Sequence, residues 1–385
     1  MSADIVFEEI DYSKLGTEKW NLTDYSSQTV LNRISSVNTH VSDFFSNVGR
    51  GIVTGMDDCF ILSGNIEGKV FKGYSKALKQ NIHIESELVR PILKGDSVHA
   101  YEPLIPELFV LYPHVIKEGK TVVIPEKELE KQFPRTYAYL LNFKETLVAK
   151  KIKYKTNPEY WYSLHNSRDM SLFCEKKIIT PYLANKCQMS FDFEGGMFTN
   201  DKCSVLKLKQ QYETLYLPYL AILNSKLCWF YISKTSSEFA GGYFVFSNLF
   251  INPFPLLDLL ESENETAKNS LETLTDTMLT LNQQLQEKRS RFLRRLSENL
   301  EGVKITTALQ TFDQMDFAGF VAELKKLKIK LTLVQQDEWE EYFNQYREAC
   351  QELTAQINAI DNEIDNRVFD LYGLTPEERE IVLNQ

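Results

Sequence analysis

Lysines and aromatic residues are mixed closely in the stretch between residues 150 and 177. The lysines are Lys150, Lys151, Lys153, Lys155, Lys176 and Lys177, and the aromatic residues are Tyr154, Tyr160, Trp161 and Tyr162. Lysine ammonium groups bind phosphate oxygens, and aromatic rings offer faces on which bases stack. A single lysine more often lies on a solvated surface, so the prediction of a nucleic-acid-binding segment depends on the whole group.

A short polar run between these two sets of lysines contains side chains that suit base edges. Asn166, Ser167 and Arg168 follow one another here. The arginine fork fits the two acceptors of guanine, and an asparagine amide fits adenine. We therefore predict a loop in which Arg168, with Asn166 beside it, reads bases. The lysines would bind the phosphate backbone of the nucleic acid and fix its position.

The charge of the chain is distributed unevenly. The net charge is −10, but residues 1–260 hold 29 basic and 29 acidic side chains, and residues 261–385 hold 14 and 24. Residues 144–234 hold 14 basic and 8 acidic side chains. Because salt screens charges beyond about 10 Å, local charge decides whether a phosphate backbone is attracted. The acidic total does not exclude a nucleic-acid partner, and we expect the acidic C-terminal segment to face away from it.

One tetrapeptide invites a catalytic interpretation. Asn252-Pro253-Phe254-Pro255 resembles the Asn-Pro-Pro-aromatic motif of amino-methyltransferases, which holds a flipped base. Its fourth position is proline, so the stacking ring is misplaced, and the glycine-rich loop that would hold S-adenosylmethionine is missing. We predict a structural role for the tetrapeptide.

Other catalytic and metal-binding patterns are also missing from the sequence. There is no Walker-type phosphate loop, no Gly-x-Ser-x-Gly elbow and no Cys-x-x-Cys pair, and the five histidines have no metal-ligand spacing. We expect neither catalysis nor a metal or cofactor in this chain. Six scattered cysteines are typical of a reducing cytoplasm, where we place the protein.

Residues 46–258 have the pattern of an α+β domain, preceded by a polar lead-in at residues 1–45 with one helix near 26–46. Short apolar runs predict strands, and longer periodic segments predict helices. The strands are Cys59–Leu62, Leu108–Tyr112, Thr121–Ile124, Lys177–Pro181 and Tyr243–Phe246, and the helices are Lys127–Leu141 and Leu215–Ser233.

Residues 259–385 have a different, helical pattern. Apolar residues recur at alternating steps of three and four, from Leu271 to Leu285 and again from Trp339 to Ile364. Two such stripes predict two long helices packed antiparallel in a coiled-coil-like hairpin. Asp316 is placed to cap a shorter helix between them, and Gly373 to end the second. Pairing of the stripes between two chains is the alternative.

The order of motifs resembles the TaqI-like C-terminal specificity domain of type IIG restriction-modification enzymes and adenine-specific DNA methyltransferases. The matching segments are Gly51-Ile52-Val53-Thr54-Gly55 through Phe60, Pro91-Ile92-Leu93-Lys94-Gly95-Asp96, Tyr160-Trp161-Tyr162, Lys177-Ile178-Ile179-Thr180-Pro181, Leu223-Asn224-Ser225 and Pro253-Phe254-Pro255. The end of the chain, from Glu363 through Leu371 to Glu378, is also similar to the usual end of such enzymes. We expect structural roles for Gly51, Thr54, Gly55, Phe60, Pro91, Gly95, Asp96, Asn224, Ser225, Pro253 and Pro255.

The resemblance implies a target-recognition domain that binds double-stranded DNA and does no chemistry itself. The methyltransferase and nuclease portion, with its S-adenosylmethionine, would then precede residue 1 or be a separate subunit. The alternative is a free-standing specificity subunit that docks or dimerises through its helices, like half of a type I specificity subunit. The DNA sequence that is read does not follow from these residues.

Overall fold

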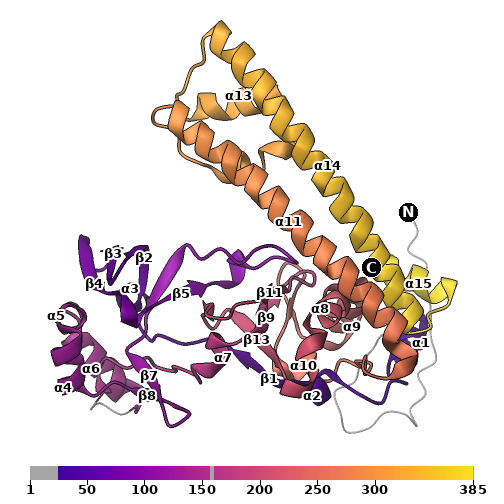
Figure 1. The fold of residues 1–385 in the computed structure, drawn as a ribbon, viewed down its shortest axis with the longest axis horizontal. Coiled ribbons are helices and arrows are strands. Elements are labelled where there is room, and N and C mark those ends of the chain that lie inside the picture. The colour runs from indigo at the N-terminus through magenta and orange to yellow at the C-terminus, as the bar shows by residue number, and fades with distance from the viewer. Residues whose placement is uncertain (1–24, 157–159, 385) are drawn as a thin grey trace.

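The computed structural model describes residues 25–156 and 160–384. They form two lobes and a long helical arm (Figure 1). We use "first lobe" for residues 51–174, "second lobe" for residues 25–50 and 175–264, and "arm" for residues 265–371. Each of the three parts has a large hydrophobic core of its own, and the second-lobe core also takes in the base of the arm. The α+β class with a helical hairpin, expected from the sequence, is confirmed.

The first lobe is built on a six-stranded sheet. Its strand order is β12(Phe198–Thr199)-β5(Val89–Leu93)-β6(Leu108–Leu111)-β2(Ile61–Glu67)-β3(Val70–Ser75)-β4(Gln80–Glu85). All neighbours are antiparallel except β12 and β5. Ile82 and Ile84 on β4 are buried while His83 between them is exposed, the alternation of a sheet with one face on a core.

Helices and a hairpin complete the first lobe. They are α3(Asp57–Phe60), the hairpin β7(His114–Lys117)-β8(Lys120–Val123), α4(Glu126–Gln132), α5(Pro134–Leu141), α6(Lys144–Lys153) and α7(Ser171–Cys174). Leu129, Leu140 and Leu147, one from each of the three longer helices, are buried in the same core as the sheet. The strand β12 comes from the second lobe's part of the chain, so the two lobes are joined by strand pairing as well as by the connecting segments.

The second lobe has an antiparallel sheet of order β1(Phe45–Arg50)-β13(Cys203–Leu208)-β9(Lys177–Pro181)-β11(Ser190–Asp192). Every residue of β9 is buried. The apolar helices α8(Tyr216–Asn224) and α9(Lys226–Thr235) share its core. Around them lie α1(Tyr25–Ile34), α2(Val41–Phe44), α10(Asn248–Ile251), α15(Pro376–Leu383) and the small sheet β10(Leu183–Ala184)-β15(Tyr243–Val245)-β14(Glu238–Phe239).

The arm is an antiparallel pair of long helices, α11(Glu265–Asn299) and α14(Leu333–Leu371), with α12(Thr307–Gln310) and α13(Phe317–Lys326) near its tip (Figure 1). The apolar stripe of α11 is buried from Leu271 to Leu285. The Asp316 side chain caps α13 by accepting a hydrogen bond from the backbone N of Gly319 (2.8 Å). Gly373 has φ +64°, the left-handed conformation that ends a helix. The predicted intramolecular hairpin and both caps are confirmed.

Four predicted elements differ from the structure at points where the chain turns. The helix expected near residues 26–46 is two helices followed by β1. Pro134 opens α5 and ends α4, because proline lacks the N–H that a continuous helix needs. Ser225 caps α9 and thereby separates it from α8. Residues 57–60 form one helical turn before β2 begins.

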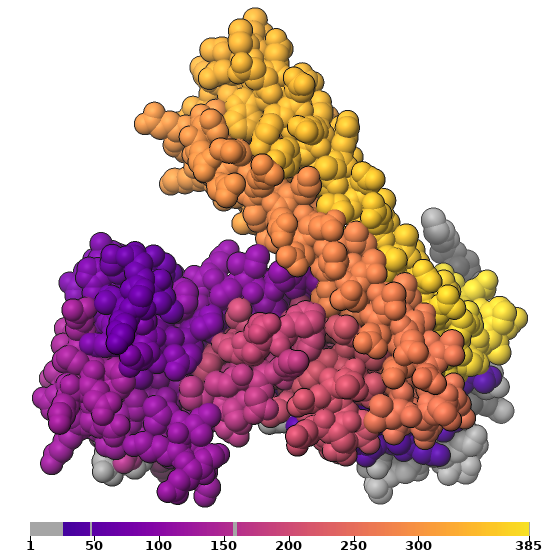
Figure 2. Space-filling model, viewed as in Figure 1, coloured from indigo at the N-terminus to yellow at the C-terminus, as the bar shows by residue number. Residues whose placement is uncertain are grey.

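The space-filling view shows a wide hollow between the first lobe and the arm (Figure 2). α11 lies on the side of the arm nearer the first lobe, and α14 on the outer side (Figure 1). Among the described residues, no helix has both the length and the apolar character required to cross a lipid bilayer.

Candidate nucleic-acid interface

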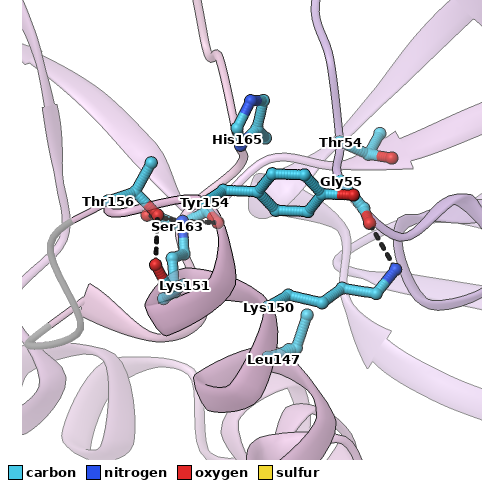
Figure 3. Close-up of a pocket in the computed structure, with 9 residues that line it drawn as sticks. All are labelled: Thr54, Gly55, Leu147, Lys150, Lys151, Tyr154, Thr156, Ser163 and His165. Atoms are coloured by element: carbon cyan, nitrogen blue, oxygen red, sulfur yellow. Dashed lines mark hydrogen bonds between the residues drawn. The ribbon is translucent and has the colours of Figure 1, made fainter.

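Two lysines of the predicted binding segment hold the first lobe together. On α6, the Lys150 Nζ donates to the backbone O of Gly55 (2.6 Å). The Lys151 Nζ donates to the backbone O and Oγ of Ser163, at 2.8 and 2.6 Å, and its side chain is buried. Figure 3 shows Lys150 reaching from α6 toward Gly55 and Lys151 turned toward Ser163, and both side chains line the same small cavity. Lys151 is therefore a structural residue, and the Nζ of Lys150 is already engaged by the protein.

The end of α6 does present an exposed basic and aromatic surface. Lys153, Tyr154 and Lys155 are exposed, and Tyr154 is 52 % accessible. The Lys153 Nζ lies 5.6 Å from the centre of the Tyr154 ring, and the ring of His165 packs edge-on against Tyr154 at 5.1 Å. These residues, which we call the Tyr154 patch, have the arrangement expected of a phosphate and base contact, which remains a prediction.

Of the four aromatic rings predicted to stack on bases, Trp161 and Tyr162 are inside the first lobe and Tyr160 is half-buried. The indole Nε1 of Trp161 donates to Glu126 Oε1 (3.1 Å), and the hydroxyl of Tyr162 donates to the backbone O of Ile124 (2.5 Å). Both side chains are at most 3 % exposed. The prediction that they face DNA is wrong for this fold, because their rings fill the core and their polar atoms anchor α4 and the segment before it.

Lys176 and Lys177 have opposite surroundings. Lys176 is exposed, whereas Lys177 is fully buried at the start of β9. The Lys177 Nζ is paired with the carboxylate of Asp192 and donates to the backbone O of Phe173 (2.6 Å). Burial lowers the pKa of Lys177, although Asp192 opposes this shift. A phosphate contact by Lys177 is thus ruled out in this conformation, while Lys176 remains a candidate.

Arg168 lies where the two lobes meet. Its backbone has φ +60°, which is rare for a residue with a β-carbon. The side-chain O of Asn166 accepts a hydrogen bond from the Arg168 N (3.2 Å), and the Arg168 Nε donates to the backbone O of Gly51 (3.0 Å). Ser167 contributes its backbone O to the hydroxyl of Tyr112 (3.0 Å). The predicted base-reading loop is therefore a defined turn, with Asn166 organising its backbone.

Sequence reasoning missed Arg50, which the fold places next to Arg168. The Arg50 guanidinium lies over the ring of Tyr182, with its Cζ 4.0 Å from the ring centre. Its Nε and Nη2 donate to the backbone O of Asp201, at 3.2 and 2.9 Å. Arg168 has a lowered pKa because it is partly desolvated and because the charge of Arg50 is nearby, with Asp201 opposing. No local pattern links residues 118 positions apart, so only the tertiary fold identifies this pair.

The first group of family-motif residues shapes the turn that connects the lobes. A β-carbon on Gly51 would lie 2.1 Å from the backbone O of Asn200, so the close approach of these two segments requires glycine. The Thr54 hydroxyl is hydrogen-bonded to the Asp57 carboxylate and also accepts from the Met56 N (3.2 Å). Gly55 has φ +79°, and Phe60 is fully buried.

The later motif residues occupy equally specific positions. Pro91 lies in β5, Gly95 packs against the backbone O of Lys202, and Asp96 is exposed beside it. The side chain of Asn224 pairs with the backbone N and O of Met189 (2.8 and 2.9 Å). Ser225 caps α9. These contacts give Gly95, Asn224 and Ser225 structural roles, whereas the side chain of Asp96 has no such contact among the described residues.

The Asn252 tetrapeptide closes the second lobe. Phe254 is fully buried, and its ring packs against those of Tyr231 (5.2 Å) and Tyr372 (6.4 Å). The backbone O atoms of Pro253 and Pro255 accept hydrogen bonds from the hydroxyls of the same two tyrosines, at 3.1 and 2.7 Å. A ring held in this way has no free face for a flipped base. The tetrapeptide therefore has a structural role at the end of the second lobe. Among the described residues, no cluster of three or more metal-ligating side chains occurs.

Comparison with known proteins identifies matching domain families and a related enzyme. Residues 90–256 match the TaqI-like C-terminal specificity domain, and residues 264–368 match a domain of unknown function (DUF8810). The chain is 28 % identical over 214 residues to the Escherichia coli "Type II restriction enzyme and methyltransferase RM.Eco57I". That match covers 51 % of this chain but only 21 % of the relative's length.

A solved structure gives a weaker likeness. The Type IIL restriction-modification enzyme MmeI, determined in complex with DNA, aligns with a TM-score of 0.49 and 11 % identity, over 90 % of this chain and 35 % of that one. The resemblance expected from the sequence is confirmed by the match of the central residues and by the related enzyme: residues 90–256 match the TaqI-like C-terminal specificity domain, and the chain is similar to a restriction-modification enzyme.

Proposed function

We propose that this chain recognises a DNA sequence and positions an N6-adenine methyltransferase and endonuclease on it, as an upstream part of the same enzyme or as a separate subunit. The observation that carries the proposal is the match of residues 90–256 to a specificity domain. S-adenosylmethionine would be bound by the catalytic portion and not by these residues. The chain spans about a fifth of the related Escherichia coli enzyme, so the activity of a whole enzyme is part of the proposal.

The exposed cations of the two lobes support contact with a duplex backbone. The Tyr154 patch, Lys176 and Arg168 lie within residues 144–234, which carry a positive excess, and the partly exposed Arg50 adds a further charge. The alternative, an interaction subunit that dimerises through its heptad stripes, lacks such support. Leu271, Leu281 and Ile364 are already buried within one chain, so these stripe positions have no free apolar surface to offer a second copy.

A selection from random DNA tests the proposal. The chain is mixed with duplexes that contain a randomised segment of about 20 base pairs, and bound molecules are amplified and sequenced. We expect one short motif to be enriched and to bind at least about a thousandfold more tightly than a scrambled duplex at physiological salt. Binding without any enriched motif, or no salt-dependent binding at all, would contradict the proposal.

A further inference from the structure

The joint between the lobes brings together two arginines from distant parts of the chain. Arg50 is the last residue of β1 in the second lobe, and Arg168 lies in the segment before α7 in the first lobe. The Nε of Arg168 donates to the backbone O of Gly51, the residue that follows Arg50. Both guanidinium groups are therefore held beside the same short connecting segment.

Each guanidinium is fixed in place while part of it stays free. Arg50 is held by the Tyr182 ring and by two hydrogen bonds to the backbone O of Asp201, yet its side chain is 41 % exposed. Arg168 uses its Nε on Gly51, and within the described residues its two terminal nitrogens donate no hydrogen bond. These terminal nitrogens form a fork that is already oriented for a ligand with two acceptors.

The two positive charges are only partly compensated. The Asp201 carboxylate is 3.9 Å from the Nη2 of Arg50, well beyond the roughly 2.7–2.9 Å of a charge-assisted hydrogen bond. Asp169, the neighbour of Arg168, has its carboxylate near the Thr121 hydroxyl (3.3 Å) and the Ser171 N (3.1 Å). An anion that contacts both guanidinium groups would compensate these charges, whereas a neutral base edge would not.

The backbone at this position is also unusual. Arg168 has φ +60°, although a β-carbon disfavours this region. Such a conformation persists when surrounding contacts impose it, and it is concentrated at functional sites. Here the Asn166 side chain and the bond to Gly51 impose it, and the result is that the Arg168 fork is presented beside Arg50.

We propose that Arg50 and Arg168 together bind one phosphate of the DNA backbone at the joint between the lobes. Arg168 is then a positioning residue and not the base reader that its sequence neighbourhood suggests. A phosphodiester supplies both the negative charge and the paired oxygens that a guanidinium fork binds. This inference rests on the proposed DNA-recognition function. It adds to that function a specific contact that would fix the position of the duplex backbone on the protein.

Salt titrations of duplex binding test the proposal. The enriched duplex and a scrambled duplex are titrated by fluorescence anisotropy between 50 and 200 mM salt, with the wild-type chain and the Arg50→Ala/Arg168→Gly double variant. Glycine suits the positive φ, so this change removes the side chain without adding strain. Arg367→Ala is the control for loss of a positive charge away from the lobes, because Arg367 is exposed on α14 and pairs with Glu363 on the same helix.

Loss of one phosphate contact should make the slope of log K against log salt shallower by about 0.9. The ratio of wild-type to variant affinity should then fall about 3.5-fold between 50 and 200 mM salt, equally for both duplexes. Arg367→Ala should leave the slope unchanged. If the variant loses affinity for the enriched duplex alone, with an unchanged slope, Arg168 reads a base and the proposal is wrong. Unchanged binding of both duplexes would mean that the pair is only structural.

A measurement without DNA separates this proposal from the proposed function. Inorganic phosphate, compared with chloride at equal ionic strength, should raise the Tm of the wild-type chain more than that of the double variant, because a ligand that binds only the folded state stabilises it. An equal response of the two proteins would overturn the phosphate site. Absence of duplex binding by the wild-type chain together with a phosphate response confined to it would contradict DNA recognition and keep the anion site.

Discussion

At the scale of single residues, His114 is a buried imidazole whose ionisation opposes folding. It is 3 % exposed at the start of β7, next to the Tyr112 ring at 4.8 Å. Burial, with a smaller contribution from Lys151, lowers its pKa from 6.5 to about 3. Between these two pH values the unfolded chain binds a proton that the folded chain does not. Stability contributed by neutral His114 is therefore complete above pH 6.5 and falls as the pH decreases.

We predict that the free energy of unfolding decreases by about 2 kcal/mol between pH 6.5 and pH 5 because of this one group. Urea denaturation at several pH values measures it. His114→Phe keeps an aromatic ring at the site and should remove most of this dependence, while the variant stays folded at pH 7.5. An equally steep dependence in the variant would show that another group is responsible.

The buried pair of Lys177 and Asp192 is the second prediction at this scale. Asp192 is 5 % exposed and also accepts a hydrogen bond from the backbone N of Met197 (3.0 Å). Asp192→Ala should destabilise the chain by about 3–5 kcal/mol, because it leaves the ammonium group buried without its partner. The double variant Lys177→Met/Asp192→Leu should recover much of this loss in thermal or denaturant unfolding. If the double variant were as unstable as the single one, charge would not be the cause.

At the scale of elements, the arm depends on aromatic packing near its tip. Phe343 on α14 is fully buried, and its ring lies 5.0 Å from that of Phe320 and 5.9 Å from that of Phe312. α14, α13 and the segment before α13 therefore share one core, which also includes Phe292 on α11. Neither long helix buries the whole of its surface.

Phe343→Ala should destabilise the arm by about 3–5 kcal/mol, because it opens a cavity in this core. Leu333→Ala is the matched control, since Leu333 is on the same helix and is 80 % exposed. Hydrogen exchange of the α11 and α14 amides would localise the effect. Equal effects of the two variants would mean that the tip is not packed as described.

At the scale of the whole molecule, the charge of the arm is segregated and not uniformly acidic. Residues 288–330 hold 10 basic and 5 acidic side chains, whereas residues 333–371 on α14 hold two basic and ten acidic ones. α14 lies on the outer side of the arm, away from the first lobe (Figure 1). The expectation that the acidic segment faces away from DNA therefore applies to α14 and not to the whole arm.

The chain on its own should transfer no methyl group from labelled S-adenosylmethionine to mixed-sequence DNA. The reason is that Phe254, the ring of its one methyltransferase-like tetrapeptide, is packed in the second lobe. Scintillation counting of recovered DNA measures the transfer, with an active adenine methyltransferase as the positive control. Transfer that disappears in Asn252→Ala would refute this prediction and would give the tetrapeptide a catalytic role.

The sequence alone determined the elements whose signal is local. Periodic apolar residues predicted the long helices, a capping aspartate predicted the start of α13, and the motif order predicted the specificity domain. The helix and cap signals survive without tertiary contacts because each depends on residues within a few turns of one another. The specificity domain was predicted from the resemblance of motifs spread between Gly51 and Pro255 to those of a known family.

The tertiary structure decided which of the side chains that are chemically suited to bind DNA are exposed at the surface. Lys153 and Lys177 have the same side chain, but Lys153 lies at the exposed end of α6 and Lys177 begins a buried strand. Likewise, Arg50 and Arg168 form one candidate phosphate site only because the fold brings the Arg168 side chain to Gly51, the residue that follows Arg50. Burial and the meeting of distant segments depend on the packing of the whole chain, and a local pattern carries no information about either.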